Sequence, residues 1–243
     1  MNPFTVAFAG NPNTGKSTLF NLLTGLRQHT GNWAGKTVIT AEGEFTHNHH
    51  TYRAVDLPGT YSLYSNSADE EAARDYIIFE EPDVTLVVLD ATSLERNLNL
   101  ALQVLEITGR AVICINLIDE ARRLGIDINV KAISKRLGVP VVAISARGKI
   151  GIDALLDQVE RVATGAFTAQ PLRISYSDEI EQGIAELIPL VEQTIGTRYP
   201  ARWIALRLLD GDDSLLASLK AHMGRTNISE AKGVVGHGVT ACH

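Results

Sequence analysis

The residues best suited to chemistry lie near the start of the chain, where positions 10–17 read Gly-Asn-Pro-Asn-Thr-Gly-Lys-Ser. This is a complete GxxxxGK[ST] phosphate-binding loop. A short apolar run precedes it at residues 4–9, and residues 16–25 after it have the apolar spacing of a helix. In that setting backbone N–H groups surround nucleotide phosphates, Lys16 reaches the outer phosphates and the Ser17 hydroxyl ligates Mg²⁺. We therefore expect phosphate contacts from Gly10, Asn11, Pro12, Asn13, Thr14, Gly15, Lys16 and Ser17.

A second phosphate motif, Asp56-Leu57-Pro58-Gly59, follows the alternating run at residues 52–55. An aspartate at the end of that strand is placed to hold Mg²⁺ through water, and the Gly59 N–H is placed to meet a γ-phosphate. A DxxG string is common by itself, but its position after a phosphate-binding loop makes it informative. All four residues are expected to line the phosphate site.

Two further strings indicate which base is bound. Residues 116–119 read Asn-Leu-Ile-Asp after a buried-strand pattern, and Ser145-Ala146-Arg147 close another one. The Asp119 carboxylate is suited to accept N–H bonds from guanine N1 and N2, where adenine has no donor. We expect Asn116, Leu117, Ile118, Asp119, Ser145, Ala146 and Arg147 to form the base site. The predicted ligand is GTP or GDP rather than ATP.

Residues 25–36 are polar and glycine-rich, and predict a long loop that orders when GTP binds. Gly35, Lys36 and Thr37 at its end are expected near the phosphates, with Thr37 reaching Mg²⁺ and the γ-phosphate. Thr30 and Thr40 are competing candidates for that threonine.

Position 60 lacks the glutamine that orients the attacking water in Ras-type GTPases. Thr60 and Tyr61 stand there instead, so we expect slow hydrolysis or help from another charge. In GTPases with asparagine at the position of Asn13, that side chain helps to hold a potassium ion beside the β- and γ-phosphates. Lys16, Asn13 and Thr37 are therefore the expected catalytic residues.

These strings together resemble the amino-terminal GTPase portion of the FeoB family of bacterial ferrous-iron transporters. The most specific matches are Asn32-Trp-Ala-Gly35 and Asp56-Leu-Pro-Gly-Thr-Tyr-Ser-Leu63, with a further match at residues 90–98. The resemblance covers about residues 4–163. It implies that the carbonyls of Gly31 and Trp33 complete a potassium site with Asn13, and that Thr37 is the magnesium threonine. Leu117 departs from the family, which more often has methionine there.

The pattern of elements predicts an α/β fold, a mostly parallel sheet with helices on both faces followed by a small all-helical domain. Strands are expected near residues 3–9, 38–46, 50–56, 84–90, 111–116 and 140–144, with the second and third forming a hairpin. The predicted GTPase domain is 1–165, the linker 166–175 and the helical domain 176–243, with helices at 178–188, 199–209 and 214–222 and a weakly patterned tail. By resemblance the helical domain slows GDP release.

Composition narrows the function classes. The 243 residues have a formal net charge of −6, which argues against a general nucleic-acid binder. No run of 18 apolar residues and no signal peptide is visible, and two cysteines indicate no disulfide framework. The resemblance implies a membrane-spanning iron-permeation portion that this sequence lacks, and a place at the cytoplasmic face of the bacterial inner membrane. A homo-oligomer is left open.

Histidines invite a metal-site interpretation in two places. His47, His49 and His50 fall in the turn of the expected hairpin, and without carboxylates or cysteines at ligand spacing we favour an exposed turn. His237, Cys242 and His243 are explained as well by a mobile tail. Arg96 is expected to form a surface ion pair.

The function predicted from the sequence is a GTPase switch that regulates ferrous-iron uptake with Mg²⁺ and K⁺ as cofactors. The alternative is a stand-alone potassium-dependent GTPase acting on ribosomal or transfer RNA, against which the acidic balance argues. A small-substrate kinase is a third hypothesis, disfavoured by the guanine-reading Asp119.

Overall fold

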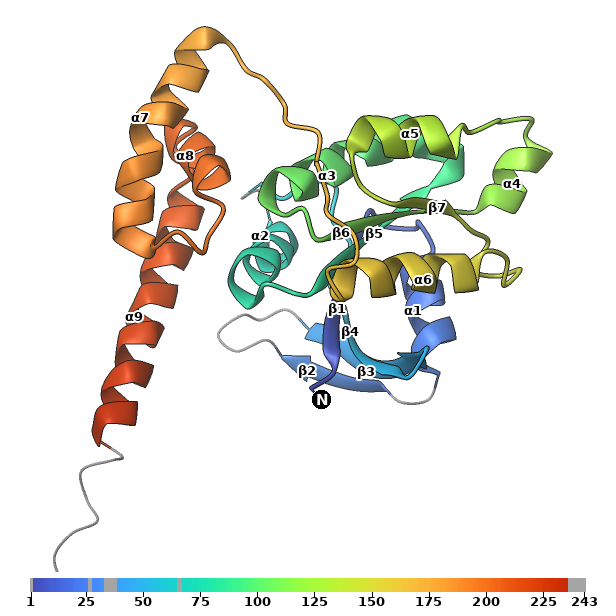
Figure 1. The fold of residues 1–243 in the computed structure, drawn as a ribbon, viewed down its shortest axis with the longest axis horizontal. Helices are drawn as coiled ribbons and strands as arrows, with labels where there is room; N and C mark the ends of the chain where they lie inside the picture. The colour runs from blue at the N-terminus through green and yellow to red at the C-terminus, as the bar shows by residue number, and fades with distance from the viewer. Residues whose placement is uncertain (1, 26–27, 33–38, 65–66, 236–243) are drawn as a thin grey trace, which may run out of the picture. The chain divides into compact units, whose positions relative to one another are not determined.

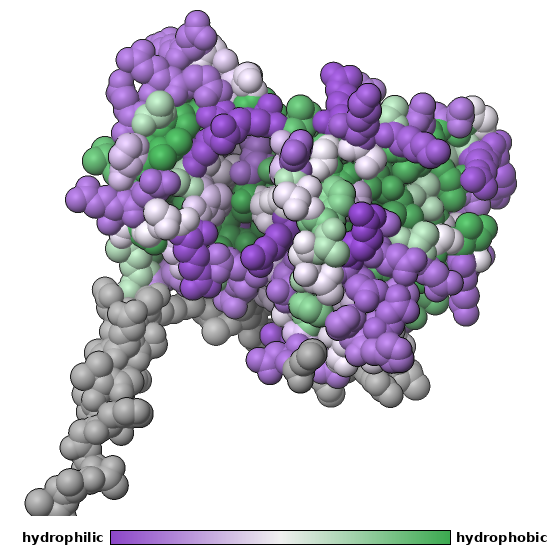
Figure 2. All heavy atoms as spheres, in the orientation of Figure 1, coloured by the Kyte–Doolittle hydropathy of each residue, from purple (hydrophilic) through white to green (hydrophobic). Residues whose placement is uncertain are grey.

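The structure is a computed structural model that describes residues 2–25, 28–32, 39–64 and 67–235. The chain divides into two compact units, Met1–Ser175 and Tyr176–His243 (Figure 1). On the face drawn in Figure 2, hydrophilic and apolar residues are interspersed over the surface of each unit. Among the described residues, no helix is both long and apolar enough to cross a bilayer.

A seven-stranded sheet forms the centre of the first unit, in the order β2-β3-β4-β1-β5-β6-β7. The strands are β1 (Phe4–Gly10), β2 (Gln28–Asn32), β3 (Ile39–His47), β4 (His50–Asp56), β5 (Val84–Asp90), β6 (Ala111–Asn116) and β7 (Val141–Ala143). Strands β4, β1, β5, β6 and β7 run parallel, whereas β2, β3 and β4 pair antiparallel. Together with the helices on its faces, this sheet confirms the predicted fold class.

Helices cover both faces of the sheet (Figure 1). The helices of this unit are α1 (Lys16–Thr24), α2 (Ala68–Asp75), the π-helix η1 (Tyr76–Glu80), the 3₁₀ turn η2 (Ala91–Ser93), α3 (Leu94–Ile107), α4 (Ile118–Arg123), α5 (Val130–Leu137) and α6 (Ile152–Ala163). Alternate residues of β1 enter different cores. Val6 and Phe8 pack with α1 and α6, whereas Ala7 and Ala9 pack with α3.

The central strands read as near-continuous apolar runs because both of their faces are covered. In β5, the sequence Val-Thr-Leu-Val-Val-Leu is buried at every position. Burying side chains on both sides of a sheet stabilises it by about 25 cal/mol per Å² of apolar surface removed from water. The sheet is therefore a rigid base for the loops that leave its carboxyl edge.

Part of the segment 25–36, predicted as a long loop, is a strand in the structure. Residues 28–32 form β2, which pairs with β3 from Gln28↔Gly43 to Asn32↔Ile39. The segment Gln-His-Thr-Gly-Asn has no alternating apolar pattern, because an edge strand is held by its backbone hydrogen bonds rather than by a buried face. The helix expected near residues 69–80 is also divided, since its last turn is the π-helix η1.

The second unit consists of α7 (Asp178–Ile195), α8 (Ala201–Leu209) and α9 (Asp213–Val235). Acidic residues in the first turn of α7 suit the helix dipole. One of them, Glu181, receives two 2.7 Å hydrogen bonds from Arg202 of α8. Trp203 and Ile204 of α8 are buried. Helix α9 is longer than the predicted 214–222, and the predicted weakly patterned tail is helical as far as Val235.

The connecting segment before this unit is partly fixed to the first unit. The Gln170 N–H donates to the Gly138 carbonyl at 3.0 Å, and the Leu172 N–H donates to the Leu137 carbonyl at 2.9 Å. Residues 166–175 therefore follow the end of α5 for part of their length.

Candidate nucleotide-binding site

The predicted motifs meet at the carboxyl edge of the parallel strands. The register pairs Phe8 of β1 with Asp56 of β4, and Asp90 of β5 with Asn116 of β6. The phosphate-binding loop leaves β1 at Gly10, between those two pairs. Ligands of open α/β sheets bind outside this edge.

The loop of residues 10–17 has the backbone that its sequence demands. Gly15 caps α1 with a φ of 78°, in the left-handed region that favours glycine. At Gly10, a Cβ would lie 2.6 Å from the carbonyl oxygen of Val88, too close for any other residue. The Thr14 hydroxyl donates to the Asn11 carbonyl at 3.0 Å and closes the turn. Asn13 is exposed at the tip, with a φ of 66°.

The two phosphate motifs contact each other through their charged side chains. Lys16 Nζ donates to Asp56 Oδ1 and to the Leu57 carbonyl, the latter at 2.6 Å. The Ser17 hydroxyl lies 3.3 Å from Asp56 Oδ2. A hydroxyl and a carboxylate that face each other are hard oxygen donors of the kind that Mg²⁺ prefers. Ser17 and Asp56 therefore fit the metal position expected of them.

Asn116 connects the phosphate loop to the base loop, a role that sequence analysis did not assign. Its Nδ2 donates to the Thr14 carbonyl at 2.9 Å, and its Oδ1 accepts from the Ala146 N–H at 2.9 Å. The side chain is fully buried. An amide at the end of a strand is the only sequence signal for this role, because its two partners lie 102 and 30 residues away.

Asp119 and Ser145 lie together beyond β6. Leu117 turns the chain with a φ of 63° and caps α4, which begins at Ile118. A hydrogen bond from Ser145 is the main cause that lowers the pKa of the Asp119 carboxyl, so the group is ionised at neutral pH. Asp119 as a residue is only partly buried, but its Oδ1 is covered by protein atoms and has no hydrogen-bond partner among the described residues. An acceptor of this kind is costly unless a ligand supplies a donor.

Thr60 and Tyr61, which follow Gly59, are not placed to orient an attacking water as a glutamine would. Thr60 is buried, and its N–H donates to the Gly10 carbonyl at 3.1 Å. Tyr61 is exposed, with the Arg96 guanidinium 4.6 Å from its ring centroid. This cation–π contact replaces the surface ion pair expected for Arg96, which makes none with the residues that the structure describes.

Several predicted residues are not placed beside the phosphate-binding loop by the described structure. Trp33, Gly35, Lys36 and Thr37 lie outside the described residues. Gly31 pairs with Thr40 in the β2–β3 ladder, and Thr30 pairs with Ala41. Gly59 lies beside the phosphate-binding loop, because a Cβ built on it would be 3.5 Å from the Pro12 backbone, and Arg147 is exposed.

The family model described as "Ferrous iron transport protein B" matches residues 4–159. This chain belongs to the FeoB family. A second model, the FeoB cytosolic helical domain, matches residues 176–235. The FeoB assignment thus accounts for both units, the G domain and the helical domain that follows it.

Relatives and solved structures agree with the FeoB assignment. The Fe(2+) transporters FeoB of Shigella flexneri and Escherichia coli K12 are each 41% identical over 222 residues, which cover 87% of this chain and 27% of theirs. The chain therefore spans about a quarter of the length of these relatives. The cytosolic domain of T. maritima FeoB in a GDP form has a TM-score of 0.82 at 34% identity, covering 91% of this chain and 86% of that one. For the L. pneumophila cytosolic domain the TM-score is 0.80 at 34% identity, with coverages of 90% and 88%.

Proposed function

We propose that this chain is the GTP-binding and GTP-hydrolysing regulatory module of a bacterial ferrous-iron transporter. The observation that carries the proposal is the unpartnered, buried oxygen of Asp119 beside Ser145, at the same sheet edge as the phosphate-binding loop. Solved FeoB cytosolic domains in GDP and GMPPNP forms, similar to this chain at TM-scores of 0.82 and 0.79, support a guanine nucleotide as the ligand.

In this proposal each motif has a defined task. Lys16 stabilises the negative charge of the outer phosphates, and the N–H groups at the start of α1 bind phosphate oxygens. Ser17 and Asp56 hold Mg²⁺, Asp56 through water. Thr37 joins the metal when GTP is bound, and Gly35 and Lys36 approach the phosphates with it. The Asp119 carboxylate accepts the guanine N1–H and N2–H bonds, with the Ser145 and Ala146 backbone beside the base.

The Asp119→Asn variant tests the guanine assignment. An amide at position 119 turns its NH2 group toward the 2-amino group of guanine, and it suits xanthine, which has an oxygen in place of that amino group and keeps N1–H. We expect GDP affinity to fall about 10- to 100-fold, as for the loss of hydrogen bonds to a charged group, and xanthosine diphosphate affinity to rise. Competition against a fluorescent GDP analogue measures both. Glu120→Gln, which removes the exposed neighbouring carboxylate, is the matched control. Unchanged GDP affinity in Asp119→Asn would place the base elsewhere.

We also propose that K⁺ assists hydrolysis through Asn13. Asn13 is exposed at the loop tip, and the buried Thr60 offers no amide to orient water. A cation beside the phosphates would stabilise the charge that develops in the transition state. Turnover in KCl should exceed that in NaCl at least tenfold, and Asn13→Ala should lose this difference while it keeps its GDP affinity. Equal rates in the two salts would refute the role.

The part of each relative that this chain does not match suggests where the module acts. They are named as iron transporters and are several times longer than this chain. We propose that the module works at the cytoplasmic face of the inner membrane, that a membrane-spanning portion forms the iron path, and that the helical unit slows GDP release. Family models over both units favour this role over the alternative of an RNA-directed GTPase.

A further inference from the structure

Two histidines flank the tip of the β3–β4 hairpin. The strands are joined by Asn48 and His49, whose φ values of 43° and 69° suit a tight type I′ turn. His47 and His50 are the closing pair of the ladder. The predicted turn is therefore present, but His47 is not the exposed residue that the sequence suggested, because its side chain is only 14% exposed.

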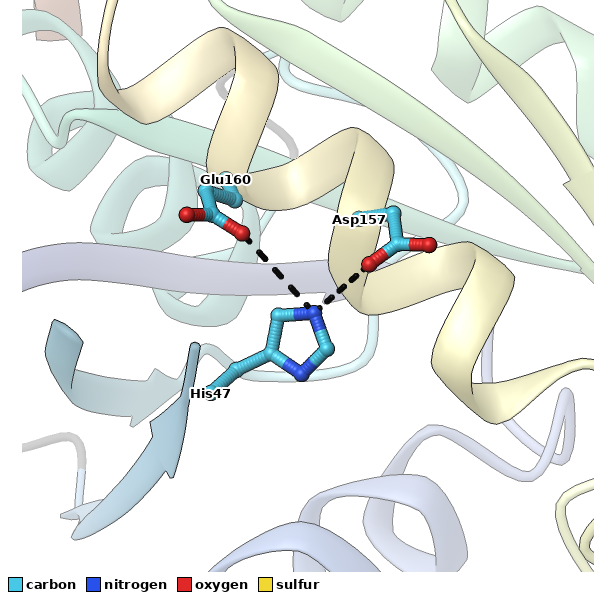
Figure 3. Close-up of side chains that lie close together, drawn as sticks. All are labelled: His47, Asp157 and Glu160. Atoms are coloured by element: carbon cyan, nitrogen blue, oxygen red, sulfur yellow. Dashed lines mark hydrogen bonds and ion pairs between the residues drawn. The ribbon is translucent and has the colours of Figure 1, made fainter. Parts of the chain in front are cut away.

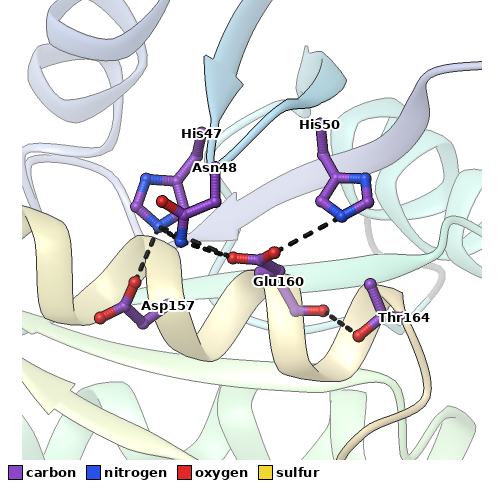
Figure 4. A network of polar contacts seen from close by, with 6 residues as sticks. All are labelled: His47, Asn48, His50, Asp157, Glu160 and Thr164. Atoms are coloured by element: carbon purple, nitrogen blue, oxygen red, sulfur yellow. Dashed lines mark hydrogen bonds and ion pairs between the residues drawn. The ribbon is translucent and has the colours of Figure 1, made fainter.

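The hairpin tip lies against α6, which carries two carboxylates three residues apart. His47 Nε2 lies 2.8 Å from Asp157 Oδ1 and 3.9 Å from Glu160 Oε2 (Figure 3). His50 Nε2 lies 3.5 Å from Glu160 Oε1, and the Asn48 amide donates to Glu160 Oε2 at 2.9 Å (Figure 4). No carboxylate lies at ligand spacing from these histidines in the sequence, but the fold brings Asp157, 110 residues away, into contact with His47.

The arrangement is suited to a cation for two physical reasons. One imidazole nitrogen carries at most one proton, yet His47 Nε2 has Asp157 Oδ1 at 2.8 Å, the Asn48 amide nitrogen at 3.2 Å and Glu160 Oε2 at 3.9 Å. The ligand atoms of His47, Asp157 and Glu160 also lie within 4.8 Å of one another. Around a tetrahedral ion with bonds of about 2.0–2.2 Å, ligand atoms are about 3.3 Å apart. The two separations that involve His47, 2.8 and 3.9 Å, bracket that value, and the two carboxylates lie within 4.8 Å of each other.

We propose that His47, Asp157 and Glu160 bind a divalent transition-metal ion. The mixed nitrogen and oxygen donors suit ions of borderline hardness such as Zn²⁺, Co²⁺ or Fe²⁺. Mg²⁺ and Ca²⁺ prefer oxygen alone, and no thiolate is present in the cluster to select a soft ion. Glu160 is 22% exposed and Asp157 is 55% exposed, so an ion has access from solvent.

This metal site is separate from the nucleotide site. Strand β4 begins at His50 and ends at Asp56, so six residues at about 3.3 Å each separate the two sites by roughly 20 Å along the strand. The ion would join the hairpin to α6, two segments that are distant in sequence. Metal binding and nucleotide binding can therefore be measured independently in the same protein.

Calorimetric titration of Zn²⁺ into the full, GDP-loaded chain tests the proposal. The background variant carries His237→Ala, Cys242→Ala and His243→Ala, so that the terminal residues contribute no ligands. We expect one ion per chain, with the affinity lowered at least tenfold by His47→Ala, by Asp157→Asn and by Glu160→Gln. His49→Ala, which removes the exposed histidine of the same turn, should bind as the background does. Co²⁺ should give a visible absorption band that Glu160→Gln abolishes.

The outcomes separate a metal site from an ion-pair network. No binding of Zn²⁺ or Co²⁺ by the background variant would mean that the cluster holds only ion pairs and would overturn the proposal. Equal loss in His49→Ala and His47→Ala would overturn it as well, because His49 is outside the ligand set. GDP affinity, measured for each variant, confirms that the G domain is folded. An unchanged GDP affinity with no metal bound would leave the proposed GTPase function intact.

Discussion

The sharpest test of the nucleotide site is the loss of Asn116, whose amide holds two loops together. Asn116→Ala removes the hydrogen bonds to the Thr14 carbonyl and from the Ala146 N–H, both 2.9 Å long. Thr14 and Ala146 are each at most 3% exposed, so water does not readily replace the lost partner. An unsatisfied buried polar group costs about 1–3 kcal/mol, which gives about 2–6 kcal/mol for the pair.

The assay separates this positioning role from a general loss of stability. If about 2 kcal/mol of the loss is felt by the bound nucleotide, GDP affinity falls about 30-fold, as measured with a fluorescent GDP analogue. Asn97→Ala is the matched control. Asn97 is also buried, accepts from the Asp90 N–H at 3.2 Å and donates to the Ser93 carbonyl at 2.9 Å, but it contacts neither nucleotide loop. Similar losses of GDP affinity in both variants, or none in Asn116→Ala, would refute the reasoning.

Two further predictions concern the loop and the core. Gly15→Ala should weaken GDP binding more than tenfold, because its Cβ would collide with the Asn116 amide as well as requiring a positive φ. Gly125→Ala also requires a positive φ but its Cβ meets nothing within 4 Å, so it should leave GDP affinity unchanged. Equal losses of GDP affinity in the two variants would show that the collision with Asn116 is not the cause. Burial, with a smaller contribution from the Glu160 charge, raises the pKa of Tyr52 to about 12. The unfolded state then loses this proton first, near pH 10, so stability should fall between pH 10 and 12 by about 1–3 kcal/mol. Tyr52→Phe should reduce this slope in urea titrations at stepped pH and cost little at pH 7, since the hydroxyl has no partner among the described residues; an unchanged slope would contradict the assignment.

Much of the fold follows from short-range patterns in the sequence. The apolar runs of β1, β5 and β6 and the turn residues that end them indicate parallel strands, and the motifs then fall at one edge because parallel strands end together. The positive φ of Gly15 is equally predictable, since the loop motif specifies glycine there.

What sequence reasoning missed depends on backbone pairing or on distant contacts. Strand β2 has a polar sequence and is visible only through its ladder with β3. The carboxylates beside His47 come from α6, which no local spacing rule brings to the hairpin. The hydrogen bonds by which Asn116 connects two loops could likewise be predicted only by knowing which loops lie on either side of β6.

The edge position of β2 has a consequence for how a GTPase of this shape changes state. Gly31, expected to offer its carbonyl to K⁺, lies on β2, which is separated from β1 by β3 and β4. Three strand spacings correspond to about 14 Å. For the Gly31 carbonyl to reach a K⁺ held by Asn13, Gly31 and Asn32 would have to lose their pairing with Thr40 and Ile39 of β3. Each backbone hydrogen bond lost would cost only about 0.5–1.5 kcal/mol, an amount that the proposed K⁺ would have to offset. Strand β2 would then pair with β3 in one nucleotide state, and its Gly31 end would leave β3 and approach the phosphates in the other.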